Sequence, residues 1–339
     1  IRRPPRSTLS SSSAASDVYK RQVLKKENLV SKQINENLST KRLDVVLAET
    51  FPEFSRSRLK KWLESDLVSV NGKMISKPSH KVFYPSLLEL IVPEENLVLD
   101  LAEQIDLNIV EANKEFIVVD KLAGMVVHPG AGNKTGTLLN ALLNDYPELK
   151  KLPRAGIVHR LDKDTSGLMV IARNEKSFQS LSDQISERSV KRIYQAFVVG
   201  KIERSGKIDA PIGRHPKNRQ KQAVIHSGRD AVSYYKVLQK FGSYSHLQVS
   251  LETGRTHQIR VHMNHIGNPL IGDPLYGRRR RFAKNTHQKL REIIESFPRQ
   301  ALHAAELSFI DPSSDKRVIF QSNLPADLEE LREKLIDQA

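Results

Sequence analysis

A dense group of ionisable side chains lies in the segment from Gly156 to Gly167, GIVHRLDKDTSG, between two predicted strands. It contains Asp162 and Asp164, together with a histidine, an arginine and a lysine. Ionisable groups are costly to bury without partners, so such a loop is either plainly exposed or functional. A carboxylate here could act as a nucleophile, or two carboxylates could share acid and base roles in a hydrolysis. The structural alternative is an Asp-Thr-Ser turn that caps the following element.

Two further patterns could suggest bound cofactors. The segment 130–136, GAGNKTG, resembles a phosphate-binding loop, but it lacks the GKS or GKT ending of a P-loop and the spacing of a dinucleotide fingerprint. His257, His262 and His265 could bind metal, yet the HExxH spacing is absent and no acidic residue accompanies them before Asp273. We therefore expect neither a nucleotide cofactor nor a metal ion.

The composition favours a polyanionic partner. Lysine and arginine total 54 residues against 39 of aspartate and glutamate, a formal net charge of +15, as is typical of proteins that bind nucleic acid or an anionic surface. We expect no membrane association, because no apolar run approaches the length that spans a bilayer. Cysteine is absent, which excludes disulfides and a thiolate nucleophile and favours a cytoplasmic protein.

The first 22 residues differ in character from the rest of the chain. IRRPPRSTLSSSSAASDVYKRQ has neither an apolar core nor any periodicity, and it resembles a translated adapter sequence. We expect 1–22 to be a non-native, disordered scar, followed by a polar lead over 23–40.

The ionisable loop belongs to a large unit that we predict to be α+β. Apolar and β-branched runs predict strands at Phe116–Asp120, Gly156–His159, Leu168–Ala172, Ile193–Val199, Ser233–Leu238 and Leu247–Leu251. Apolar residues at helical spacing predict helices at Leu138–Asn144, Ser177–Ile185, His257–Ile266 and Lys289–Ser296. This irregular alternation favours a central mixed, mostly antiparallel sheet over regular βαβ winding. We place this domain at 113–325, after a linker at 98–112, with a terminal amphipathic helix at 326–339.

A smaller unit at 41–97 precedes it. Apolar residues at helical spacing predict two short helices, the second capped by Ser55. Strands are predicted at Leu67–Val70, which ends at an Asn-Gly turn signal, and at Leu87–Val92. The start of the second helix is crowded by four basic residues, Arg56, Arg58, Lys60 and Lys61. Taken alone, such a run is more often a solvated helix face than a binding site.

Several stretches resemble one family of RNA-modifying enzymes. HRLDKDTSGLMVIARN, which begins at His159, is similar to the signature of the RluA family of pseudouridine synthases. KLAGMVVHPGAGNKTGTLLNAL, RIYQAFVVG and LETGRTHQIRVHMNHIGNPLIGDPLYG occur around it in the expected order. The smaller unit resembles the S4 RNA-binding module, which favours RNA contact for its basic residues. The likeness covers residues 41 to 325 and is greatest to the subgroup that acts on large-subunit ribosomal RNA.

The resemblance implies a chemical role for several residues. It makes Asp162 the nucleophile in the isomerisation of specific uridines to pseudouridine in large-subunit ribosomal RNA, without a cofactor, and leaves Asp164 dispensable. It makes Arg260 the cation that pairs with the nucleophile, with Arg255 as the rival candidate. Tyr194 would stack on the base and take part in a late proton transfer.

Other residues are expected to bind RNA. Arg160 would fill the gap left by the flipped nucleotide, and we assign RNA contacts to Arg255, His257 and Gln258 of GRTHQIR. We expect a monomer whose partner is large-subunit rRNA or the pre-ribosomal large subunit. The alternative from another class is a non-catalytic S4-type ribosome-binding or assembly factor, which would have no use for Asp162. A two-carboxylate hydrolase would instead leave cleaved RNA or free uracil.

Overall fold

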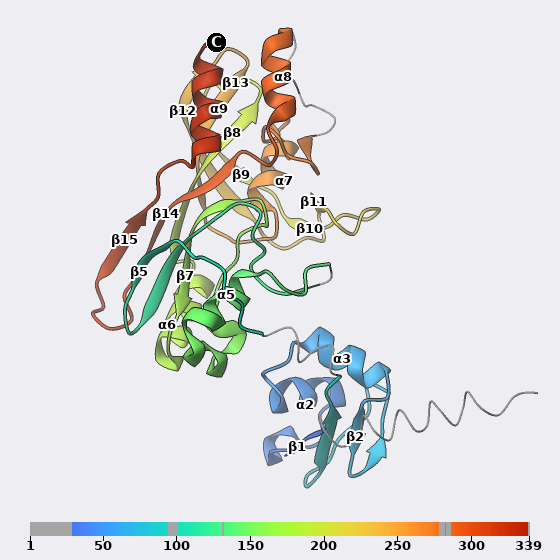
Figure 1. Cartoon of the computed structure of the whole chain (residues 1–339). Coiled ribbons are helices and arrows are strands. Elements are labelled where there is room, and N and C mark those ends of the chain that lie inside the picture. Colours follow the sequence, from blue (N-terminus) through green and yellow to red (C-terminus); the bar gives the residue numbers. More distant parts are fainter. Residues whose placement is uncertain (1–28, 94–100, 131, 278–281, 283–285, 338–339) are drawn as a thin grey trace, which may run out of the picture. The chain divides into compact units, whose positions relative to one another are not determined.

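The protein is described by a computed structural model, which covers residues 29–93, 101–130, 132–277, 282 and 286–337 (Figure 1). The chain divides into two compact units, residues 1–99 and 100–339. The predicted scar at 1–22 lies outside the described residues. Among the residues that are described, no helix combines the length and the apolar character needed to cross a bilayer.

The first unit packs two helices against a small antiparallel sheet. In its described part the sheet has the order β1-β4-β2-β3, formed by Leu29–Gln33, Leu87–Ile91, Val68–Val70 and Lys73–Met74 respectively. A short 3-10 turn, Glu36–Leu38, precedes α2 (Leu43–Thr50) and α3 (Arg56–Glu64). Both helices bury an apolar face in the core of this unit.

Local signals account for the ends of these elements. The Ser55 hydroxyl accepts a hydrogen bond from the backbone N–H of Arg58 and caps α3, as predicted. Asn71 and Gly72 have φ values of 51° and 76°, the left-handed pair that a two-residue hairpin turn requires.

The polar lead predicted over 23–40 was wrong in its described part. Residues Leu29–Gln33 form β1, which pairs with β4, and Ile34 and Leu38 are buried in the core of the unit. Because β1 is an edge strand, alternate residues stay exposed. The segment therefore has a polar sequence although it belongs to the sheet.

The second unit is built on a mixed sheet. Within the described residues nine strands form it, in the order β5-β6-β7-β14-β8-β13-β12-β9, with β15 paired to β14. Every pairing is antiparallel except that of β14 with β7. This confirms the predicted α+β class with a mostly antiparallel sheet. In chain order the strands are Ile109–Ala112, Phe116–Lys121, Ser166–Ala172, Lys191–Val199, Gly206–Asp209, Val232–Phe241, Tyr244–Leu251, Leu302–Ile310 and Arg317–Gln321, that is β5 to β9 and β12 to β15.

Helices cover both faces of this sheet. On one face α5 (Leu138–Asp145) and α7 (Gln258–His265) share a core with it, and on the other α6 (Glu175–Ser186) does. At one end, α8 (Gln288–Ser296) packs beside α9 (Ala326–Asp337), at the top of Figure 1. These helices begin and end within two residues of the predicted bounds in the described part of the chain.

The strand predicted at Gly156–His159 was wrong. Two 3-10 segments, Pro147–Lys151 and Pro153–Gly156, lead up to it, and within 156–159 only Ile157 makes an isolated bridge to β7. Gly156, the first residue of the predicted strand, has a positive φ of 75°, which lies outside the β region. The chain therefore enters the ionisable loop from a turn.

The linker predicted at 98–112 also differs from the structure in its described part. Residues Ile109–Ala112 form β5, which pairs with β6. Further upstream, the Leu101 carbonyl accepts a hydrogen bond from the Asn140 side chain (2.7 Å), and Glu103 accepts one from the backbone of Gly136. The segment from 101 onward is therefore fixed to the second unit by hydrogen bonds.

Candidate active site

Asp162 lies in the loop that leads into β7, and its carbonyl and that of the next residue accept hydrogen bonds. The N–H of Thr165 donates to the Asp162 carbonyl (3.1 Å), which closes a turn. Buried Lys121, at the end of β6, donates from Nζ to three carbonyls, those of Leu122, Met125 and Lys163 (2.7, 2.9 and 3.0 Å). The position of Asp162 is therefore set by its backbone and not only by its side-chain contacts.

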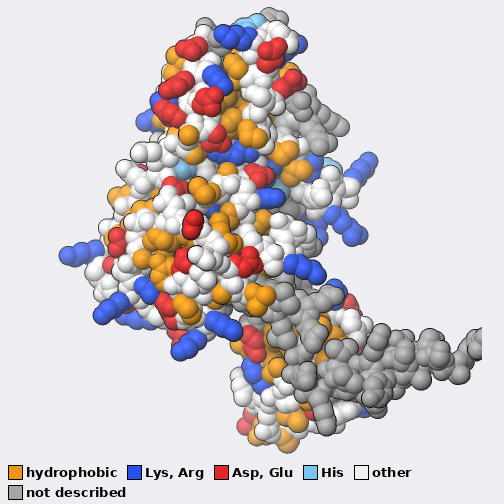
Figure 2. All heavy atoms as spheres, in the orientation of Figure 1, with side chains coloured by type: hydrophobic (Ala, Val, Ile, Leu, Met, Phe, Trp, Pro, Cys, Tyr) orange, Lys and Arg blue, Asp and Glu red, His pale blue; other side chains and the backbone are white. Residues whose placement is uncertain are grey.

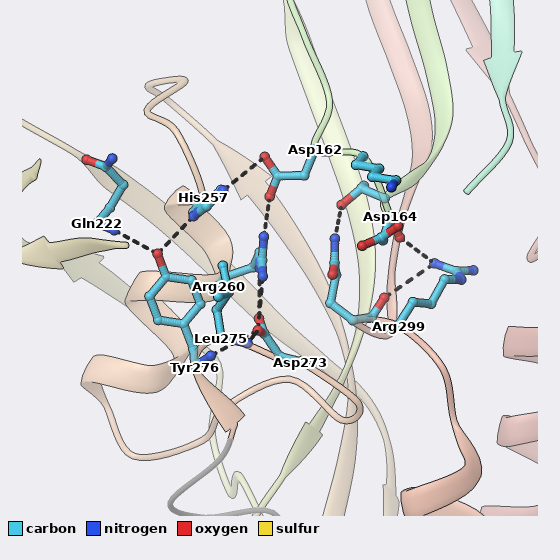
Figure 3. Close-up of polar contacts among 12 residues, drawn as sticks. Asp162, Asp164, Gln222, His257, Arg260, Asp273, Leu275, Tyr276 and Arg299 are labelled. Atoms are coloured by element: carbon cyan, nitrogen blue, oxygen red, sulfur yellow. Dashed lines mark hydrogen bonds and ion pairs between the residues drawn. The ribbon is translucent and has the colours of Figure 1, made fainter. Parts of the chain in front are cut away.

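Arg260 pairs with Asp162 from α7. Its Nη1 donates to Oδ2 of Asp162 at 3.0 Å, while Nε and Nη2 donate to the two carboxylate oxygens of Asp273 at 2.8 and 3.0 Å (Figure 3). Burial alone would lower the pKa of Arg260, but the hydrogen bonds and charges of the two carboxylates outweigh it and raise that pKa. A permanent cation thus stands beside the Asp162 carboxylate.

Asp273 is a residue that the sequence interpretation missed. Its side chain is 0% exposed, and Oδ1 also accepts from the backbone N–H groups of Leu275 and Tyr276 (2.8 and 3.0 Å). With its bidentate bond to Arg260, the carboxylate fixes the guanidinium plane. The only sequence signal was its place in GDPLYG, a stretch of the family pattern.

Arg255, the rival partner for Asp162, points elsewhere. Its Nε donates to the carbonyl of Asp230 at 2.9 Å. The geometry therefore selects Arg260 as the cation that contacts Asp162.

His257 and Tyr276 form a second arm toward Asp162. The backbone N–H of Gln222 donates to the Tyr276 hydroxyl oxygen (2.9 Å), which lies 2.9 Å from Nδ1 of His257. On the other side of the ring, Nε2 lies 3.9 Å from Oδ1 of Asp162 (Figure 3). His257 itself has a left-handed φ of 56°, and its imidazole lies between the Tyr276 hydroxyl and the Asp162 carboxylate. Tyr276, like Asp273, was missed from the sequence.

Tyr276 accepts from Gln222, and the direction of its hydrogen bond with Nδ1 of His257 follows the tautomer of the imidazole. Burial raises the pKa of Tyr276 to about 12 and lowers the pKa of His257. Nε2 of His257 lies beside the oxygen of Asp162 that Arg260 does not contact, at 3.9 Å and without a hydrogen bond.

Tyr194 and Asp162 line one cavity of about 730 Å³, a volume within the range of small-molecule sites. Tyr194 lies on β8, with its side chain buried. Burial raises the pKa of its hydroxyl; the positive charge of Arg192 opposes this shift and the negative charge of Asp162 adds to it. Asp162 keeps 18% of its side chain exposed, so the carboxylate is accessible from the cavity.

The cavity wall is strongly cationic. Its two acidic residues are Asp162 and Glu252, and the latter is already paired with Arg188 at 2.8 Å. The basic residues of the wall are Arg154, Arg160, Arg188, Arg192, Arg255 and Arg260. Such a wall favours an anionic ligand.

A basic hairpin adjoins this site. Strands β10 (Ile212–Arg214) and β11 (Gln222–Val224) pair with each other, and β11 contributes the backbone donor to Tyr276. Figure 2 shows lysine and arginine side chains projecting from the hairpin at the right of the view. Exposed Arg214, Lys217 and Arg219 lie in this part of the chain.

Gln258 was predicted to bind RNA; it lines the cavity, but its amide is hydrogen-bonded within the protein. Its amide oxygen accepts from Thr253 and from the Arg255 backbone (2.7 and 2.9 Å), and its nitrogen donates to Val232 and Ser233 (2.9 and 3.0 Å). All four hydrogen-bonding positions of the amide are used inside the protein. Gln258 therefore holds the start of α7 against β12.

The remaining residues predicted to contact RNA are exposed, except that Arg58 is half-buried. Arg160 is exposed at the cavity wall, directly before the Leu-Asp pair. In the first unit, Arg56, Lys60 and Lys61 are exposed on α3, while Arg58 lies over the ring of Trp62 (5.9 Å). In the described part of the chain, no group of three histidine or acidic residues is arranged to hold a metal ion.

Comparisons with known proteins agree with the sequence signature. A family profile described as RNA pseudouridylate synthase matches residues 115–265, and one described as S4 domain matches residues 41–82. The ribosomal large subunit pseudouridine synthase D of Pseudomonas aeruginosa is 49% identical over 290 residues, which cover 86% of this chain and 90% of the relative. The protein of the same name from Pasteurella multocida is 45% identical over 294 residues, covering 87% and 91%.

Solved structures show the same fold. Human RNA pseudouridylate synthase domain containing 4 matches with a TM-score of 0.53 at 21% identity, covering 67% of this chain and 92% of that one. Human RNA pseudouridylate synthase domain containing 1 matches with 0.50 at 24%, covering 69% and 96%. Together with the identities to the curated relatives, the fold and the site establish that this chain belongs to the RNA pseudouridine synthase family, whose members are enzymes.

Proposed function

We propose that this enzyme converts specific uridines of large-subunit ribosomal RNA to pseudouridine, with Asp162 as its nucleophile. One observation carries the proposal. A cavity-exposed carboxylate is held by a buried arginine at 3.0 Å within a wall in which arginines outnumber acidic residues. A carboxylate in these surroundings can react with a ribose while phosphates bind around it.

The chemistry sets the requirements that this site must meet. The bond from C1′ to N1 breaks, the uracil turns, a bond from C1′ to C5 forms, and the proton on C5 is replaced by one on N1. The product has the mass of the substrate. Oδ2 of Asp162 is bound to Arg260 and Oδ1 lies 3.9 Å from His257, so Oδ1 is the oxygen free to react. A carboxylate serves both attack at C1′ and a route through a glycal.

Neighbouring residues supply the other functions in this proposal. Tyr194 stacks on the uracil, and its neutral hydroxyl takes part in the late proton transfer from C5. Arg160, exposed beside the cavity, occupies the place of the flipped nucleotide in the RNA. Asp164 is the dispensable carboxylate, because its carbonyl contacts Arg299 (3.2 Å) and its side chain is not among the described residues that line the cavity.

The substrate is inferred from two sources. The curated relatives are named for the large ribosomal subunit, and the first unit carries an S4 domain with basic residues on α3. We therefore propose large-subunit rRNA, free or in a pre-ribosomal subunit, as the partner of a monomer acting in the cytoplasm, without metal or nucleotide. The basic β10–β11 hairpin supports a path for phosphates next to the cavity.

The test is carbodiimide-based mapping of pseudouridine in rRNA treated with the wild-type chain, Asp162→Asn or Asp164→Asn. We expect Asp162→Asn to form no pseudouridine while its RNA affinity stays within about threefold, because the amide keeps the shape and removes the nucleophile. Asp164→Asn should retain substantial activity. Activity of Asp162→Asn above a few per cent, or a dead Asp164→Asn, would contradict the assignment. Cleaved RNA or free uracil would indicate a hydrolase instead.

A further inference from the structure

Arg192 is a buried cation that has no carboxylate partner among the described residues. Three arginines are buried in the described residues: Arg192, Arg260 and Arg299. Arg260 binds Asp162 and Asp273, and Arg299 binds Asp327 through Nε and Nη2 (2.6 and 2.9 Å). The side chain of Arg192 makes no hydrogen bond and no ion pair with any residue that the structure describes, and its buried Nε has no partner.

Arg192 lies on the same side of β8 as Tyr194. It lies on β8 two residues before Tyr194, so both side chains are on the same face of the strand, and both line the cavity. The strand rise separates them by about 6.6 Å, a span comparable with that from a nucleobase to the phosphate of the same nucleotide.

The opposite wall leaves room for this guanidinium. Gly254 faces it so closely that a Cβ at position 254 would lie 2.7 Å from Nη1 of Arg192. Arg192 is 9% exposed, and a buried charge without a partner is costly to maintain. The cost is removed when a ligand brings an anion, and a guanidinium matches the oxygens of a phosphate with two parallel hydrogen bonds.

We propose that Arg192 binds a phosphate that flanks the target uridine, and so sets the position of the ribose against Asp162. This rests on the proposed function, in which Tyr194 stacks on the base. The contact is distinct from those of exposed arginines at the cavity rim, because it is made only when the nucleotide has entered the cavity.

The experiment pairs protein variants with modified RNA. The probe is an rRNA stem-loop with one target uridine, made with a neutral methylphosphonate at either the 5′ or the 3′ linkage of that uridine. Dissociation constants are measured for the full chain carrying Asp162→Asn, so that the RNA stays unchanged, with and without Arg192→Met. Lys191→Met is the matched control, since it removes the same charge from the adjacent, exposed residue of β8.

We expect Arg192→Met and one of the two methylphosphonates each to weaken binding about tenfold or more, as for loss of a charge-assisted hydrogen bond. Combined, they should be no worse than either alone, because they remove the same contact. Any loss of affinity from Lys191→Met should multiply with the loss from a methylphosphonate at either linkage. If the loss of affinity from Arg192→Met instead multiplies with the loss from the methylphosphonate at both linkages, the proposal is overturned. That is the result expected if Arg192 contacts a uracil oxygen.

Folding and catalysis are scored separately. If Arg192→Met does not fold, Arg192→Lys replaces it, because lysine keeps the charge but loses the planar fork. The coupling free energy between residue 192 and the same linkage should then shrink. An unchanged coupling would argue against a guanidinium contact. Pseudouridine formation on the native stem-loop is measured with Asp162 intact. Its absence refutes the proposed function, whereas its presence with multiplicative losses refutes only the assignment of Arg192.

Discussion

Asp273→Asn removes one charge from the group formed by Asp162, Arg260 and Asp273 and leaves the shape of the side chain nearly unchanged. In the wild-type chain the carboxylate accepts from Nε and Nη2 of Arg260 and from two backbone N–H groups. In the variant an amide –NH2 faces one of these donors. Arg260, which is 4% exposed, then keeps only Asp162 as a charged partner.

The expected loss of stability follows from this burial. Breaking a buried ion pair by removing one partner costs about 3–5 kcal/mol when the other charge is left without compensation; because Arg260 keeps Asp162, we expect the lower end, about 3 kcal/mol. For a unit of the size of residues 100–339, one kcal/mol corresponds to roughly 2–4 °C in Tm. We therefore expect the Tm of the second unit to fall by about 10 °C. Because Arg260 also loses its orientation, kcat should fall by on the order of 100-fold.

Calorimetry of the full chain measures the first effect, and pseudouridine formation under single-turnover conditions the second. Asp209→Asn is the matched control, since its carboxylate pairs with Lys207 (2.7 Å) on the exposed surface and should leave Tm essentially unchanged. A change in Tm no larger than that of the control, with activity retained, would refute the reasoning that Asp273 supports the site.

Three further outcomes are expected. Tyr194→Phe should slow the chemical step more than it weakens binding, because the ring still stacks while the hydroxyl is lost; equal single-turnover rates would reduce Tyr194 to a packing residue. Burial lowers the pKa of His159 to about 3 and that of His246 to about 4. Between pH 6.5 and about pH 4 the unfolded chain therefore binds protons that the folded chain does not, and the free energy of unfolding should fall as pH falls. Equal free energies of unfolding at pH 7.5 and pH 5 would contradict this. Replacing Arg56, Arg58, Lys60 and Lys61 with Gln should decrease the slope of log affinity against log salt for long rRNA by up to about three units, measured by titrating binding against salt. An unchanged slope would mean that these residues form only a solvated helix face.

Helices were predicted well because their signal is local. The leucines of α5 recur at helical spacing after a Thr137 that caps the helix, so the sequence alone places its start. Edge strands carry a weaker signal. Neither β1 nor β5 shows an apolar run, because at least one side of each strand faces solvent, and both were assigned to connecting segments. The parallel pairing of β14 with β7 joins residues 137 apart in the chain, and no local pattern encodes it.

The stretch GRTHQIR explains why residue types alone could not define the site. Arg255, His257, Gln258 and Arg260 are close in sequence, and all are polar. The left-handed φ at His257 ends the preceding loop and starts α7, which decides the direction of each side chain that follows. Gln258 then points into the protein, and Arg260 lies between two carboxylates. Arg260 meets Asp162 while it is held by a carboxylate 13 residues further along the chain, and Arg255 instead contacts the carbonyl of Asp230; these partners are distant in sequence, so only the fold distinguishes the two arginines.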